Sequence, residues 1–116
     1  MNKKELKSLI AYTVENGGAT LAPNGKIVSF PIGYQVAEKQ HEKIISLEKG
    51  LPLETLNAYL LTAKKARGFV GLWIEDNKLY LDISLHILNK GIALSMGRKE
   101  KQLSIYEWES GLCLAC

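Results

Sequence analysis

The sequence predicts an α+β fold in which an antiparallel-rich sheet of about five to seven strands carries two or three packed helices. Residues 69–85 contain two stretches of alternating apolar and polar side chains, the pattern of strands that cover a core with one face. Residues 2–16 and 52–67 instead repeat apolar residues at helical spacing. The 116 residues, 47% hydrophobic and 23% charged, fit a single domain over residues 1–116.

The first helix is expected to begin after Asn2. Its side chain can cap the helix, and Glu5 follows at the spacing of a capping box. Glycines 17 and 18 then end the helix. Next, Asn24-Gly25 predicts a two-residue type I′ turn that pairs Leu21 with Val28.

The middle of the chain is less regular. Residues 34–37 and 44–47 resemble short strands, whereas the stretch 38–49 stays open between strand, helix and loop. Pro52 suits the first turn of a second helix, and Gly68 is expected to end it.

The clearest pattern joins strands 69–75 and 78–85 at Asp76-Asn77. One face of this hairpin is apolar and the other is mixed. The register predicts the apolar pairs Val70–Ile83, Leu72–Leu81 and Ile74–Leu79, and the mixed pairs Trp73–Tyr80 and Gly71–Asp82. A slip of one residue would expose the apolar set, so we expect this register to be well specified.

A third helix is expected to begin at Asn89. Its inward side chains are predicted to be Ile92, Ala93 and Met96. Strands over 103–108 and 112–115 follow, joined by Ser110-Gly111. If the strands before and after this helix lie in one sheet, their connection should be a right-handed crossover.

Seven segments together show a further pattern: residues 17–20, 33–36, 69–74, 79–84, 92–94, 97–98 and 102–106. They resemble a group of small proteins found in phages, prophages and conjugative elements of Gram-positive bacteria, and the resemblance covers about two thirds of the chain. It implies a mobile-element accessory protein and no transferable catalytic residues. Small phage accessory proteins are often inhibitors of host defence, including anti-CRISPR proteins that block an effector nuclease.

The net charge of +3 is too small for a dense nucleic-acid-binding surface, and it has the wrong sign for a DNA mimic. The basic residues form three groups: Lys3, Lys4 and Lys7; Lys64, Lys65 and Arg67; Arg98, Lys99 and Lys101. If these groups converged, a small nucleic-acid-binding accessory protein would be the alternative. No signal peptide or apolar span of roughly 18 residues appears, so we expect a cytoplasmic protein with no membrane partner.

The C-terminal cysteines suggest one metal candidate. Cys113 and Cys116 have the two-residue spacing that places two thiolates on a zinc ion, and His41 and His86 could complete a tetrahedral site. This pair departs from the pattern of the resembling proteins. The alternative is a pair of ordinary cysteines and no cofactor.

Asp82, Ser84 and His86 alternate along one strand and therefore share a face. Neighbours on one strand face lie about 7 Å apart. That separation is too large for the hydrogen bonds of a catalytic triad, so we expect a polar outer face and no enzyme.

Four aromatic residues provide the main functional hypothesis. Trp73 and Tyr80 share a face of the hairpin, and Tyr106 and Trp108 share a face of their own strand. Aligned in one sheet, they would form a contact surface for a host protein with Asp82 and Glu75 at its margin, because aromatic residues are enriched in interface hot spots. The alternative is that helices cover this face and make it a second core.

Overall fold

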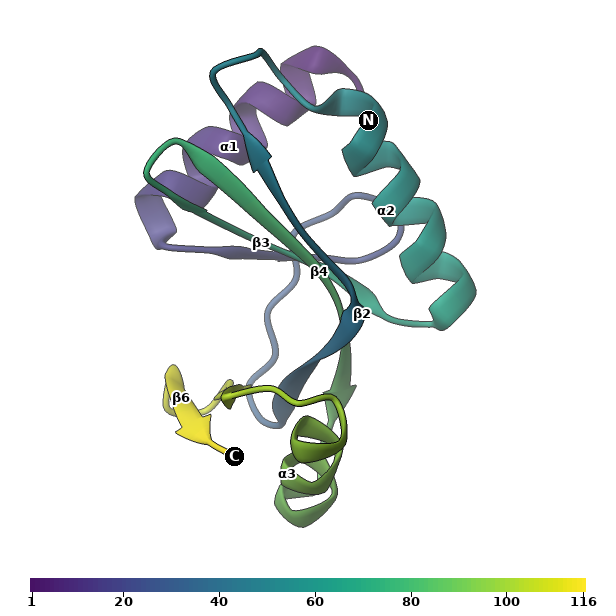
Figure 1. Cartoon of the computed structure of the whole chain (residues 1–116), viewed down its shortest axis with the longest axis vertical. Helices are drawn as coiled ribbons and strands as arrows, with labels where there is room; N and C mark the ends of the chain where they lie inside the picture. The colour runs from purple at the N-terminus through teal and green to yellow at the C-terminus, as the bar shows by residue number, and fades with distance from the viewer.

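The computed structural model describes residues 1–116 and shows three helices on a six-stranded sheet (Figure 1). The elements in chain order are α1 (Lys3–Asn16), β1 (Ala19–Leu21), β2 (Tyr34–Ser46), α2 (Leu53–Ala66), β3 (Phe69–Glu75), β4 (Lys78–Ile87), α3 (Lys90–Lys99), β5 (Ser104–Glu107) and β6 (Leu112–Ala115). The strand order is β1-β3-β4-β2-β5-β6, and every neighbouring pair is antiparallel. The predicted α+β class is confirmed.

The connectivity contains two interleaved β-α-β units. Because β2 is antiparallel to both β4 and β5, strands β4 and β5 run parallel on either side of it, and α3 links them. In the same way β2 and β3 run parallel on either side of β4, linked by α2. This is the split β-α-β arrangement of ferredoxin-like folds, extended here by α1, β1 and β6.

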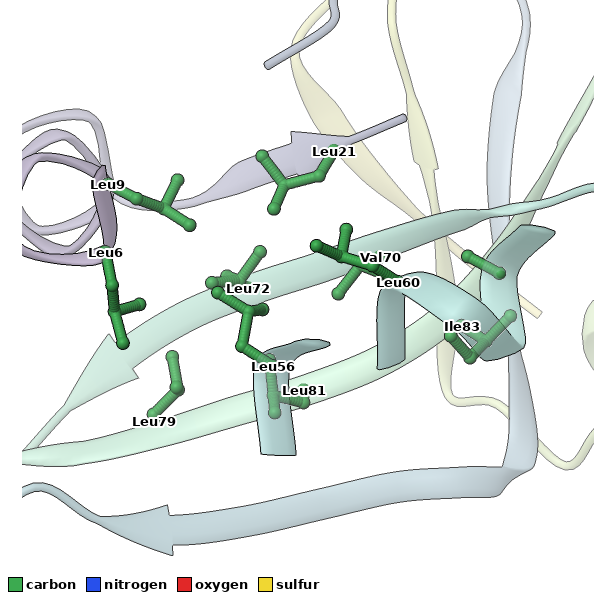
Figure 2. Packing of buried hydrophobic residues seen from close by; sticks show 11 residues of the cluster. Leu6, Leu9, Leu21, Leu56, Leu60, Val70, Leu72, Leu79, Leu81 and Ile83 are labelled. Carbon is green, nitrogen blue, oxygen red and sulfur yellow. The ribbon is translucent and has the colours of Figure 1, made fainter. Parts of the chain in front are cut away.

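The β3–β4 hairpin forms in the predicted register, with Trp73 opposite Tyr80 and Gly71 opposite Asp82. Asp76 and Asn77 have φ of 51° and 59°, as a type I′ turn requires. The apolar face is buried at Val70, Leu72, Leu79, Leu81 and Ile83. These side chains join leucines of α1 and α2 in the larger core cluster (Figure 2).

All three helices cover the same face of the sheet. The smaller core cluster joins Val36, Ala93 and Ile105 and includes the partly buried Ile87 of β4. Ile87 lies four residues after Ile83, so both point to one side of β4. Therefore α3 packs on the face that α1 and α2 cover further along, and the opposite face has no helix on it. None of the helices is long and apolar enough to span a bilayer.

The turn at residues 23–25 differs from the expected two-residue turn. Leu21 bridges Ile27 instead of Val28, and of the two turn residues only Gly25 has a positive φ, 86°. A type I turn closed by a left-handed glycine uses three loop residues, which shifts the pairing by one. The second strand is reduced to this single bridge.

Strand β2 resolves the ambiguous stretch as one long strand with a bulge. Its pairing with β4 changes register between Glu38–Ile83 and Lys43–Leu81. Residues 39–42 therefore lie opposite the single residue Asp82. Extra residues of this kind break the alternation that identifies a strand in sequence.

Helix α2 ends just before Gly68, as expected, with Arg67 as its C-cap in the left-handed conformation at φ of 55°. One local prediction is wrong. Ile92 is 60% exposed although it was expected to face inward. Helix α3 instead approaches the sheet through the small residues Ala93 and Gly97, which leaves Ile92 on its outer side.

Candidate binding cleft

The sheet face without helices is hollowed into a cleft of about 760 Å³, which we call the open-face cleft. Strands β2, β3 and β4 provide its floor. Tyr12 and Asn16 of α1, with residues 17–20 and 27–29, bound it on the β1 side, and β5 and β6 bound it on the other. Its volume lies within the range of about 300–1,000 Å³ that is typical of ligand sites.

Trp73 and Tyr80 stand at one end of the cleft. Their rings stack at 4.5 Å between centroids with 11° between planes, in the cross-strand pair that the hairpin register creates. Trp73 is 49% exposed. A large aromatic side chain is thus held in a defined position with half of its surface free for contact.

Tyr106 and Trp108 occupy the other end. Their rings meet edge to face at 5.0 Å, and Phe30 packs against Trp108 at 5.4 Å. All five predicted contact residues, including Asp82, line the same cleft. They form two pairs at opposite ends instead of one continuous patch, and the alternative of a helix-covered second core is wrong.

A chain of two hydrogen bonds runs from Trp108 across the cleft floor to Ser84 of β4. The Trp108 indole N–H donates to Gln35 Oε1 at 2.9 Å, and Gln35 Nε2 donates to Ser84 Oγ at 2.9 Å. Gln35 was missed by the sequence reasoning. The available signal was its place between Tyr34 and Val36, which both point to the core side.

Asp82 is the only charged residue among the cleft-lining residues. Its carboxylate lies over Gly71, where a Cβ atom would come within 2.4 Å of Asp82 Oδ1. Burial, with a smaller contribution from the charge of Glu42, raises the pKa of Asp82 from 3.8 to about 6, opposed by a hydrogen bond from the Gly71 backbone. No lysine or arginine forms a salt bridge with it.

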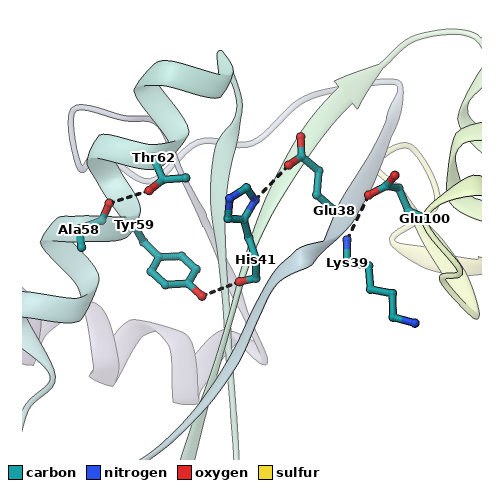
Figure 3. A network of polar contacts seen from close by, with 7 residues as sticks. All are labelled: Glu38, Lys39, His41, Ala58, Tyr59, Thr62 and Glu100. Atoms are coloured by element: carbon teal, nitrogen blue, oxygen red, sulfur yellow. Dashed lines mark hydrogen bonds and ion pairs between the residues drawn. The ribbon is translucent and has the colours of Figure 1, made fainter.

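The bulge in β2 brings Glu42 to this position. Contacts to two helical segments fix the bulge: the Tyr59 hydroxyl donates to the His41 carbonyl, and the Lys39 N–H donates to Glu100 Oε1 at 3.2 Å (Figure 3). Gln102 Nε2 donates to Glu42 Oε1 at 2.8 Å. Burial, and then the nearby charge of Asp82, raise the pKa of Tyr59.

Ser84 and His86, which alternate with Asp82 along β4, contact residues outside this set. Ser84 pairs with Gln35, and His86 stacks on Phe30 at 3.8 Å between ring centroids. His86 Nε2 also donates to the Ile32 carbonyl at 2.9 Å. No hydrogen bond links Asp82, Ser84 and His86 to one another, as expected from their spacing along the strand.

The four metal candidates are not brought together. Cys113 is exposed and lines the cleft, whereas Cys116 packs with the smaller core cluster beside α3. His41 Nδ1 contacts Glu38 at 3.1 Å, and His86 lies beneath Phe30. No group of three or more His, Cys, Asp or Glu side chains is placed to hold a metal ion.

The three basic groups also lie away from the cleft, which has no lysine or arginine in its lining. Comparison of the chain with family models, curated proteins and solved structures finds no match.

Proposed function

We propose that this chain is a non-enzymatic binding protein that holds a protein partner against its open-face cleft. The observation that carries the proposal is that five aromatic residues line one cleft whose floor no helix covers: Tyr12 at the end of α1, Trp73, Tyr80, Tyr106 and Trp108. Tyrosine and tryptophan supply large, rigid contact areas at low entropic cost and dominate interface hot spots. The half-exposed Trp73 is the expected anchor.

The same surface argues against nucleic acid. An uncovered sheet with aromatic residues on a split β-α-β fold is also the design of a common RNA-binding module. Such modules need cations near the bases to contact phosphates. This cleft offers the carboxylate of Asp82 and no lysine or arginine, so phosphate groups would be repelled.

The biological setting rests on the resemblance to mobile-element proteins. It identifies the partner as a host protein in the bacterial cytoplasm. In the most specific form of the proposal, the chain sterically blocks a CRISPR effector nuclease. Because Asp82, Ser84 and His86 form no hydrogen-bonded triad, we propose that the chain acts by covering a surface that its target uses for its own function.

Pull-down from a lysate of a Gram-positive host tests the proposal. The tagged protein should recover a defined partner after nuclease treatment, and Trp73→Ala should reduce the recovery. Leu61→Ala is the matched control, because Leu61 is 63% exposed on α2 and lies outside the cleft. Loss of recovery after nuclease treatment, or equal recovery by both variants, contradicts the proposal.

A further inference from the structure

The electrostatics of the cleft are unusual for a chain with a positive net charge. The protein carries 15 lysines and arginines against 12 acids, yet none of the cations pairs with Asp82. A carboxylate withdrawn from water is costly unless a cation or several hydrogen bonds compensate it. The Gly71 backbone donates one hydrogen bond to Asp82, and the repulsive charge of Glu42 lies nearby. The site therefore lacks a positive partner.

The aromatic stack lies beside this carboxylate. Tyr80 precedes Asp82 by two residues on the same strand face, about 7 Å away, and Trp73 stacks on Tyr80. A guanidinium group is planar, so it can lie on an aromatic face while its N–H groups reach a carboxylate in a bidentate pair. A lysine ammonium group is compact and not planar, so it would pack less well against the aromatic face of the Trp73–Tyr80 stack.

Gly71 makes this arrangement accessible. With no side chain on β3 opposite Asp82, the carboxylate folds over the glycine backbone on the cleft floor. Glu42, held by Gln102, adds a second negative charge close by. A cation entering here would relieve the repulsion between the two acids.

Building on the proposed function, we infer that the cleft takes an arginine side chain of the protein partner, with Asp82 as its counter-ion and the Trp73–Tyr80 stack as its platform. Charge complementarity selects this occupant over an acidic or apolar one. The charge of Glu42 makes the electrostatic potential around Asp82 more negative. Gln35 and Ser84 line the adjoining part of the cleft floor.

Titration with a short capped peptide that contains one arginine tests the inference. The peptide should shift the Trp73 indole resonance, with dissociation in the millimolar range. The same peptide with citrulline, which keeps the shape and lacks the charge, should bind roughly ten- to hundredfold more weakly. A lysine peptide should fall between the two.

Two variants locate the effect at Asp82. Asp82→Asn should abolish the difference between the arginine and citrulline peptides, and Gly71→Ala should reduce it by displacing the carboxylate while keeping its charge. Glu48→Gln, which removes an exposed charge outside the cleft, should leave the difference intact.

The inference is overturned if the arginine and citrulline peptides bind equally, if Asp82→Asn keeps the difference, or if the wild-type protein binds no arginine peptide at millimolar concentration. Equal binding of the lysine peptide overturns the assignment to arginine. A captured partner that depends on Trp73 but is unaffected by Asp82→Asn would leave the proposed function standing and refute only this inference.

Discussion

The carboxyl group of Asp82 should make the stability of this protein fall as the pH rises. Its pKa in the folded chain is about 6, against 3.8 for an ordinary aspartate, because of burial and the charge of Glu42. The folded state thus binds the proton more tightly than the unfolded state does. The stabilisation is complete below pH 3.8 and is lost as the pH rises through about 6. At about 1.4 kcal/mol per pKa unit, the loss approaches about 3 kcal/mol.

Asp82→Asn removes this titration. We expect the free energy of unfolding of the variant, relative to the wild-type protein, to increase by roughly 2–3 kcal/mol between about pH 4 and about pH 7.5. The ionisable groups around Asp82 are Glu42 from β2 and Tyr59 from α2, while β3 presents only Gly71. Any change in the Gly71 hydrogen bond would add a constant at both pH values.

Urea unfolding followed by tryptophan fluorescence at the two pH values measures this difference. The control is Glu48→Gln, which removes an exposed carboxylate and should show no comparable change with pH. The reasoning is refuted if the Asp82→Asn increment is the same at both pH values, or if the control changes equally. A stabilising substitution here would mean that the native chain keeps Asp82 at a cost, which is common at binding sites.

Gly33→Ala should destabilise the protein by about 1–3 kcal/mol, because a Cβ at φ of 98° would lie 2.4 Å from His86 Nε2. Gly50→Ala, at a similar φ of 108° but with open space around it, should cost less in the same urea titration, and an equal cost would contradict the predicted clash. Leu56→Ala should cost about 2–5 kcal/mol, since Leu56 is fully buried, whereas Leu61→Ala on the exposed side of α2 should stay within about 0.5 kcal/mol. Finally, a metal chelator should leave the melting temperature unchanged, since the four metal candidates lie apart, and a clear drop would reverse that assignment.

The β3–β4 hairpin could be read from the sequence in full. Its register, its turn at Asp76-Asn77 and its buried face depend on neighbours within a few residues, and alternation reports those directly. The same holds for the capped starts of α1 at Asn2 and of α3 at Asn89. The aromatic and acidic residues that line the cleft from this hairpin were therefore among the predicted contacts.

Other features depended on contacts between distant segments. The bulge of β2 is fixed by side chains from α2 and from the end of α3, so local alternation could not show a single strand over residues 34–46. Residues 23–25 form a three-residue turn, which shifts the pairing of the segments on either side of it by one residue.

Which residues share a strand face follows from the sequence alone, because side-chain direction alternates with a local period of two. That all three helices pack on one side of the sheet is visible only in the folded chain, since their position depends on the strand order β3-β4-β2-β5. That one-sided packing leaves the other face uncovered. It places the aromatic pair of β3–β4, Tyr106 of β5 and Trp108 just after it, together with Gln35 of β2 and Asp82 of β4, around one cleft.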